Sequence, residues 1–269
     1  MTHVLAAAEW GGEFDGVLDD INALFDFPKF IDLGTWFGQD IGINRTIIIA
    51  WLMTALVGLL FVIAFRDPKL VPGKLQSALE MVIDFNRQIA LDIIGPKGLK
   101  FVPMLTTFFV AIFALNIAKI TPIFMLPPTG RMAWPLMFAV IAWLIYVGVG
   151  IQNQGLGGYF AGIAFPPGVP KALYIILTPI EIVSSLILRP FTLAIRLFAN
   201  MAAGHILVVI TLVTPWIFLS SARGWPIGVF GVVLGPLVFA FELFIIALQA
   251  YIFTMLTAVY IDSSMEAHH

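Results

Sequence analysis

Long apolar stretches alternate with short polar segments along the chain, and three of them have the length of one membrane crossing: residues 46–65, 101–118 and 132–150. A helix needs about 20 apolar residues to cross roughly 30 Å of hydrocarbon. Two further stretches, residues 172–219 and 225–261, would extend as helices over about 70 and 55 Å, roughly twice that thickness. Each of these two is therefore either a pair of spans or one long, strongly tilted helix.

The polar residues within the first of the two long stretches favour a tilted helix. They recur at spacings of three and four residues, so they form one stripe only on a helix that no turn interrupts. The residues of this stripe are Glu181, Ser185, Arg189, Thr192, Arg196 and Asn200. Pro190 removes one backbone donor and could kink the helix, but residues 189–196 contain no Gly, Asn or Asp cluster that would form a loop. We therefore expect one continuous helix.

The remaining segments complete an all-α, polytopic membrane protein with about five membrane-embedded helices. Residues 75–94 place polar side chains opposite apolar ones at helical spacing, which predicts an amphipathic surface helix. Residues 151–170 are rich in Gly and Pro and are expected to form a connection. Residues 1–45 are polar and acidic, and we expect an extramembrane segment with a short helix. The predicted organisation is this segment, one membrane domain over residues 46–262, and a short tail over residues 263–269.

Composition supports the membrane assignment and excludes several functions. The 269 residues are 60% hydrophobic and 11% charged, with a mean hydropathy of +1.00, whereas soluble domains average about 25% charged residues. The formal net charge is −2 and no Lys/Arg run is present, so no nucleic-acid partner is expected. The absence of cysteine excludes disulfides, Cys-ligated metals and thiol catalysis. We expect no cofactor and no metal, and the N-terminus does not resemble a cleaved signal peptide.

The distribution of basic residues over the loops predicts the orientation in the membrane. With the N-terminus outside and an odd number of crossings, slightly more basic residues fall on the inner side than on the outer side. Those expected inside are Arg66, Lys69, Lys74, Arg87, Lys97, Lys100 and Lys171. Those expected outside are Lys29, Arg45, Lys119, Arg131 and Arg223. We therefore predict an external N-terminus and a cytoplasmic C-terminus.

Five ionisable residues lie within the apolar stretches: Glu181, Arg189, Arg196, His205 and Glu242. A charged side chain at the centre of a membrane helix costs about 2.5–3.5 kcal/mol on insertion scales, so such residues mark functional sites or structural ion pairs. Both interpretations stay open for Arg189, because it lies beside Pro190 and could be an architectural cation.

Two neighbouring helices carry the groups that a proton path needs. Glu242 and Gln249 are spaced to share one face of the last helix, Tyr260 returns near that face, and His205 lies on the preceding helix. A histidine and a carboxylate are the side chains most easily tuned to exchange protons near neutral pH. An arginine stays charged, so Arg196 could only hold an anion or repel a cation. The pattern predicts a proton relay through His205 and Glu242.

Two other function classes were weighed against a proton path. A secondary ion-coupled transporter would show repeated halves with paired broken helices, and the chain has no visible internal repeat. An intramembrane enzyme would need a nucleophile with a base, or a metal signature, and His205 is the single histidine within the apolar stretches. We therefore expect a non-catalytic membrane protein, with the transporter as the alternative.

Two segments on successive helices resemble the ATP synthase subunit a family, the proton-channel stator of the membrane sector. Residues 196–205 read Arg-Leu-Phe-Ala-Asn-Met-Ala-Ala-Gly-His, which is similar to the family segment that contains its essential arginine. Residues 248–253 read Leu-Gln-Ala-Tyr-Ile-Phe, similar to a run in the last helix of the family, and Glu242 precedes them. A weaker similarity covers residues 179–190. The resemblance extends over about residues 100–269.

The resemblance implies roles for particular residues. Arg196 would face the essential carboxylate of a rotating ring of subunit c and would block a direct proton leak between two aqueous half-channels. The residues that would line the half-channels are Asn200, His205, Glu242 and Gln249. Glu181 would lie in the outward-facing access path. The residues that we expect to form a supporting polar stripe are Ser185, Arg189, Thr192 and Tyr260.

The resemblance also implies partners and a location. The partners would be the ring of subunit c, a subunit b-type peripheral stalk, the remaining ATP synthase subunits and the lipid bilayer. The location would be a bacterial plasma membrane.

Three departures from the family pattern bear on these roles. In several bacterial members the residue after the equivalent of Gly204 is a glutamate and the residue at Glu242 is a histidine, so the acid and the imidazole are exchanged here. Lys119 stands where some relatives carry an acid, and we predict no site there. One extra residue separates Glu181 from Pro190. A π-bulge would absorb that residue, and the direction in which Glu181 faces is left open.

Overall fold

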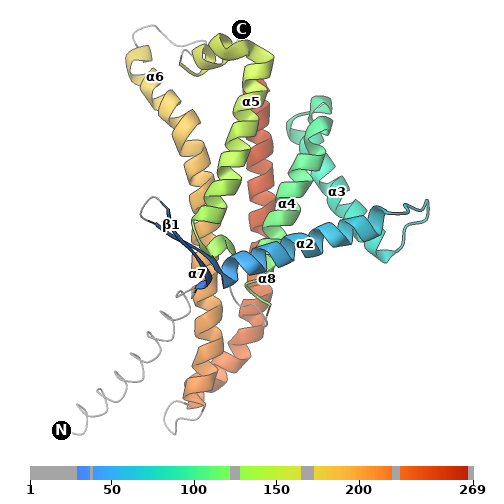
Figure 1. Ribbon diagram of the computed structural model, residues 1–269, viewed down its shortest axis with the longest axis vertical. Helices are drawn as coiled ribbons and strands as arrows, with labels where there is room; N and C mark the ends of the chain where they lie inside the picture. Colours follow the sequence, from blue (N-terminus) through green and yellow to red (C-terminus); the bar gives the residue numbers. More distant parts are fainter. Residues whose placement is uncertain (1–28, 37–38, 122–127, 165–172, 220–224, 266–269) are drawn as a thin grey trace, which may run out of the picture.

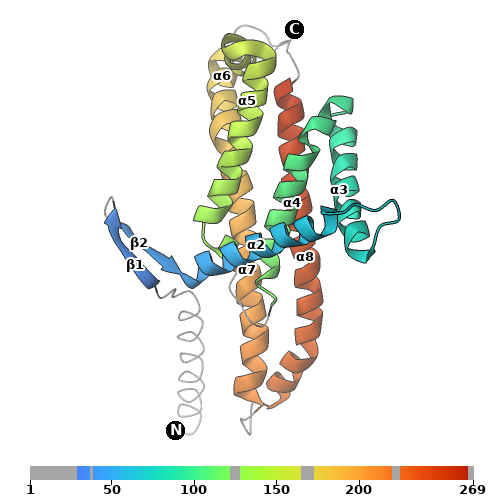
Figure 2. The same ribbon diagram turned by 45° about the vertical axis from the view of Figure 1, so that its right-hand side comes forward.

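The computed structural model describes residues 29–36, 39–121, 128–164, 173–219 and 225–265. Long helices run beside one another, and one shorter helix, α2, lies across them (Figure 1 and Figure 2). Within the described residues, five helices are long and apolar enough to cross a membrane. The prediction of an all-α, polytopic membrane protein is confirmed.

The first predicted span and the surface helix both form. Helix α2 (Arg45–Phe65) exposes large apolar side chains such as Trp51, Leu59 and Val62. A helix that is apolar on all sides belongs in lipid or against another subunit. Helix α3 (Lys74–Ile93) is amphipathic, as predicted.

The next span begins after a tight turn at Gly95, whose φ of 78° a residue with a side chain rarely adopts. The 3₁₀ helix η1 (Pro96–Phe101) leads into α4 (Val102–Ile117), and the 3₁₀ helix η2 (Pro128–Gly130) leads back toward the bundle.

Helix α5 (Ala133–Ala164) is longer than the predicted span of residues 132–150. The chain bends at Gly155, where φ is 73° and ψ is 163°, and then resumes the helix to Ala164. Glycine accepts this positive φ because it has no Cβ. The prediction that residues 151–170 form a non-helical connection is therefore wrong for residues 151–164, and residues 165–170 lie outside the described part of the chain.

The two long apolar stretches each form one continuous helical rod. Helix α6 (Tyr174–Val183), the π-helical segment η4 (Ser184–Leu188) and α7 (Arg189–Phe218) follow one another without a break, as predicted. Helix α8 (Trp225–Met265) has 41 residues and a length of about 60 Å. Helix α2 lies crosswise to α7 and α8 in both views (Figure 1 and Figure 2). A bilayer crossed by α2 therefore holds the two long helices strongly tilted.

The π-helical segment confirms the predicted bulge between Glu181 and Pro190. The N–H of Arg189 donates to the carbonyl of Ser184, five residues earlier. An expanded turn leaves backbone carbonyls short of helical donors, and the buried Tyr146 hydroxyl of α5 donates to the carbonyl of Ser185 at 3.0 Å. Tyr146 thus fixes the bulge against α5.

The described part of the acidic N-terminal segment is a β-hairpin. Strands β1 (Lys29–Trp36) and β2 (Gln39–Asn44) pair antiparallel, with Trp36 opposite Gln39. The expected short helix is therefore wrong for these residues, and residues 1–28 lie outside the described part of the chain. Acidic composition placed the segment outside the membrane but did not distinguish helix from strand, whereas the period-two spacing of Ile41 and Ile43 favours a strand.

The helices pack through small residues and a few aromatic side chains. Ala142, Ala194 and Ala250 are completely buried, one each on α5, α7 and α8. Small residues allow close approach of helices, which drives association where lipid removes the hydrophobic effect between them. The ring of Phe108 lies 5.6 Å from that of Phe253, which ties α4 to α8.

Candidate functional site

The polar faces of α7 and α8 meet along the length of the two helices. Asn200 Nδ2 of α7 donates to Gln249 Oε1 of α8 at 3.5 Å, which is the long end of the hydrogen-bond range. This contact brings together two residues that the sequence placed on facing helices.

Arg196 lies one turn before Asn200 in the polar stripe of α7 and is more exposed than Asn200. It is exposed, whereas Leu193 and Leu197 next to it are buried in the helix bundle. Its exposed neighbours Phe191 and Ile195 are large and apolar. The guanidinium thus lies on an apolar outer face of the protein, where a second membrane subunit could reach it.

A buried ion pair lies further along α7 and α8. Lys119, just beyond the end of α4, contacts Glu242 Oε2 of α8 through its Nζ, and the two side chains are 0% and 2% exposed. Gly204 of α7 faces this pair, because a Cβ added there would lie 2.6 Å from both carboxylate oxygens of Glu242. His205, the next residue, is also buried.

The structure thus places Lys119 and Glu242 in one cluster at Gly204, and the relay through His205 and Glu242 stays a prediction. A hydrogen bond of 2.5 Å from Thr129 Oγ1 of η2 to Asn116 Oδ1 of α4 lies next to this cluster along the chain. No site was predicted at Lys119. The signal available in the sequence was its position directly after an apolar span, because a lysine at the end of such a span must either reach water or find a partner.

A second polar zone lies at the other end of α7. Glu181, Ser185 and Arg189 line a cavity of 220 Å³ together with Gln154 of α5 and Ser263 of α8. Glu181 lies before the π-helical turn, Ser185 within it and Arg189 directly after it, and all three line this cavity. A polar cavity of this volume has room for water.

Two aromatic contacts organise this zone. The guanidinium of Arg189 lies 5.4 Å from the centre of the Tyr260 ring, which is a cation–π contact. The Tyr260 ring in turn lies 5.6 Å from the ring of Tyr146. The sequence correctly placed Tyr260 on the face of α8 that meets α7.

Thr192 contributes little to either polar zone. Its hydroxyl donates to the Leu188 carbonyl of its own helix at 2.7 Å, and its side chain is exposed. Threonines within helices commonly bond back to the preceding turn in this way.

The placement of Glu181 conflicts with one expectation. Glu181 lines the same cavity as Ser263 and Ser264, which belong to the C-terminal turn of α8. A cytoplasmic C-terminus and an outward-facing path at Glu181 are therefore incompatible. The local spacing of the stripe could not reveal this, because the side of the membrane depends on which end of α8 packs against α6.

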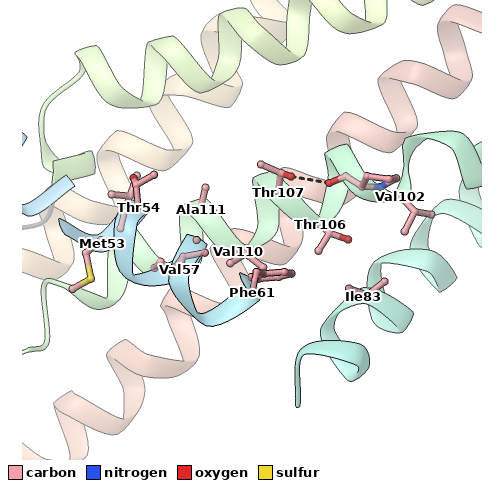
Figure 3. Close-up of a pocket in the computed structure, with 14 residues that line it drawn as sticks. Met53, Thr54, Val57, Phe61, Ile83, Val102, Thr106, Thr107, Val110 and Ala111 are labelled. Atoms are coloured by element: carbon pink, nitrogen blue, oxygen red, sulfur yellow. Dashed lines mark hydrogen bonds between the residues drawn. The ribbon is translucent and has the colours of Figure 1, made fainter. Parts of the chain in front are cut away.

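A larger cavity of 520 Å³ between α2, α3 and α4 has a different character (Figure 3). None of its 14 lining residues is charged. Some of its threonine hydroxyls donate hydrogen bonds to backbone carbonyls, as Thr107 Oγ1 does to the Pro103 carbonyl at 2.8 Å. Proton-exchanging chemistry is therefore absent from the lining of this cavity.

Comparison with known proteins identifies the family. A family model described as ATP synthase A chain matches residues 47–262. The chain is 42% identical over 229 residues to ATP synthase subunit a of Rhodococcus erythropolis, covering 84% of this chain and 83% of the relative. It is 40% identical over 275 residues to the subunit a of a Parafrankia species, covering 98% and 88%. It is 38% identical over 240 residues to that of Magnetococcus marinus, covering 86% and 87%. Since these matches include every described membrane helix, the chain belongs to the ATP synthase subunit a family and is a membrane-sector subunit of the ATP synthase complex.

Proposed function

We propose that this chain is the stator of a proton-translocating F-type ATP synthase and supplies two half-channels separated by Arg196. The observation that supports this best is the placement of Arg196 on an exposed apolar face between two polar zones. The zone on one side is the cavity that contains Glu181. The zone on the other side contains the Asn200–Gln249 contact and the Lys119–Glu242 pair.

The spacing along the helix supports two separate paths. Glu181 and Arg196 are about 22 Å apart along the axis, and Arg196 and His205 about 13 Å, at 1.5 Å per residue. Neither polar zone includes Arg196, so a proton that crosses the membrane has to change carrier near this residue. A carboxylate on a moving neighbour, such as a ring of subunit c, would serve as that carrier.

The charge of Arg196 gives the separation a physical basis. A guanidinium stays protonated, so a proton that approaches it directly meets like-charge repulsion that is weakly screened outside water. The same cation favours the ionised form of a carboxylate that arrives beside it, which promotes release of its proton. Each proton that leaks directly wastes about 2.3 kcal/mol per 100 mV of membrane potential.

The orientation and the partners complete the proposal. With the N-terminus outside and the C-terminus in the cytoplasm of a bacterium, the Glu181 zone is the inner path, and the zone of His205 and Glu242 is the outer path. The exposed apolar face around Arg196 is the contact surface for the ring of subunit c. The exposed apolar side chains of α2 remain for lipid or for a subunit b-type peripheral stalk. In this role the chain moves protons and catalyses no reaction.

The decisive test replaces Arg196 in the complete ATP synthase. Arg196→Ala is expected to abolish ATP synthesis driven by an imposed proton gradient, because the barrier between the half-channels is lost, and to leave a proton leak without rotation. Arg196→Lys is also expected to lose most synthesis, since a buried ammonium can lose its proton and lacks the planar fork.

Arg66→Ala is the matched control, because Arg66 is exposed in the segment after α2 and lies in neither polar zone. It is expected to synthesise ATP at the unchanged rate. Near-normal synthesis by reconstituted Arg196→Ala complexes would falsify the proposed role.

A further inference from the structure

Lys119 is the most enclosed charged side chain in the described part of the protein. It is 0% exposed, and its Nζ contacts Glu242, whose side chain is 2% exposed. The pair joins the end of α4 to the middle of α8, and α7 covers it with Gly204, the one residue type that leaves room for both side chains.

This enclosure decides the charge state of Glu242. A buried carboxylate without a partner takes up a proton, because the charged form loses its hydration. A carboxylate in contact with an ammonium stays ionised, since each charge compensates the other. Without Lys119, the buried carboxylate of Glu242 would therefore lose the charge that compensates it, and a protonated carboxyl group cannot accept a proton.

We propose that Lys119 is a positioning residue of the proton path, which holds Glu242 ionised inside the protein and against Gly204, next to His205. The inference rests on the proposed function, because it assumes that protons pass through Glu242. A proton that arrives on Glu242 converts the neutral pair into a neutral acid beside a cation, and its departure to the next acceptor restores the pair. Lys119 keeps its own proton throughout.

The surroundings of the pair contain few other titratable groups. On α7 these are His205, whose charge interacts with Lys119, and Arg196, about two and a half turns away. Arg131 follows η2 and carries a permanent positive charge. On α8 the described charged residue besides Glu242 is Asp262, at the far end of the helix. Besides the pair, His205 is therefore the nearby side chain of a type that can exchange a proton.

The test uses the complete ATP synthase in liposomes and measures ATP-driven proton pumping from pH 6 to pH 9. Lys119→Met keeps the length of the side chain but removes the charge, and is expected to lower pumping at pH 7 at least about tenfold. Pumping is expected to recover at alkaline pH, where an unpaired Glu242 ionises. Lys119→Arg keeps a cation and is expected to pump at pH 7 at a rate closer to the unchanged protein than to Lys119→Met.

Glu242→Gln provides the comparison, alone and combined with Lys119→Met. Both are expected to block pumping at every pH, because the carboxylate is gone, and the double variant is expected to be no worse than Glu242→Gln alone. Subunit content of the purified complex shows whether each variant assembles, and Lys119→Gln replaces Lys119→Met if the latter does not.

The outcomes separate the inference from the proposed function. If Lys119→Met and Lys119→Gln pump normally while Glu242→Gln is blocked, Lys119 has no role in the path and the proposed function stands. A loss at every pH without alkaline recovery would make Lys119 purely structural and would also overturn the inference. Normal pumping by Glu242→Gln would instead contradict the proposed path through Glu242.

Discussion

Gly204 is the residue at which α7 approaches the Lys119–Glu242 pair most closely. A Cβ there would lie 2.6 Å from the two oxygens of the Glu242 carboxylate and still closer to Lys119 Nζ. Since both side chains are buried, neither can move aside into solvent. Gly204→Ala is therefore expected to separate the ion pair or the helices and to destabilise the subunit by about 1–3 kcal/mol. Proton pumping is expected to fall, as measured in liposomes.

Gly148→Ala is the matched control for that substitution. Gly148 also lies within a membrane helix, α5, but a Cβ there meets no atom within 4 Å. This control variant is expected to be as stable as the unchanged protein or slightly more stable, because alanine favours the helix. If both variants pump equally well, the packing at Gly204 has no bearing on the pair.

At the scale of one element, the π-helical turn η4 sets the direction of the Glu181 side chain. The wider turn of η4 takes up one residue without changing the phase of α6 relative to α7. Each further residue turns an α-helix by about 100°, so one alanine inserted after Ile187 rotates α6 by about that angle relative to α7. Glu181 then leaves the polar cavity that it shares with Arg189. We expect the insertion to reduce proton pumping at least about tenfold in assembled complexes, because the inner path loses its carboxylate.

Ile187→Ala keeps the register of the helix and is the control for the insertion. Ile187 is 59% exposed, so its truncation removes little packing within the subunit. The control variant is expected to pump normally. Equal activity of the insertion variant and the control would show that the register at the bulge does not position a functional carboxylate.

At the scale of the whole molecule, an odd number of crossings places the two ends of the chain on opposite sides of the membrane. The protein has no cysteine, so single cysteines report accessibility without background. Val71→Cys, after α2, and Ser263→Cys, near the end of α8, are exposed positions and are expected to react with an impermeant reagent from the same, cytoplasmic side. Asp15→Cys, in the acidic N-terminal segment, is expected to react from the opposite side.

Right-side-out and inverted vesicles distinguish the two faces, and the cysteine-free parent is the control for unspecific labelling. Labelling of all three positions from one side would contradict the odd number of crossings. Reaction of Val71→Cys and Ser263→Cys from different sides would mean that α2 does not cross the bilayer.

The helices, their order and the facing of most stripe residues were predictable from the sequence. Apolar length and three- to four-residue spacing are local properties, and they identified the continuous rod from α6 to α7 and the amphipathic α3. The π-helical turn was expected from the resemblance to the family, because one extra residue separates Glu181 from Pro190. Where glycine and acidic residues dominate, local patterns were insufficient. Gly155 bends α5 without ending it, and residues 29–44 form a hairpin.

The partners of the buried charges depend on tertiary packing. Lys119 and Glu242 are 123 residues apart, and their contact requires that the end of α4, the middle of α8 and the side-chain-free surface of Gly204 meet at one point. The location of Glu181 beside the C-terminal turn of α8 likewise depends on which helix ends pack together. Periodicity along one helix determines on which face of that helix a side chain lies. A buried charge, however, is stabilised by a partner on another helix, and that partner is determined only when the helices assemble.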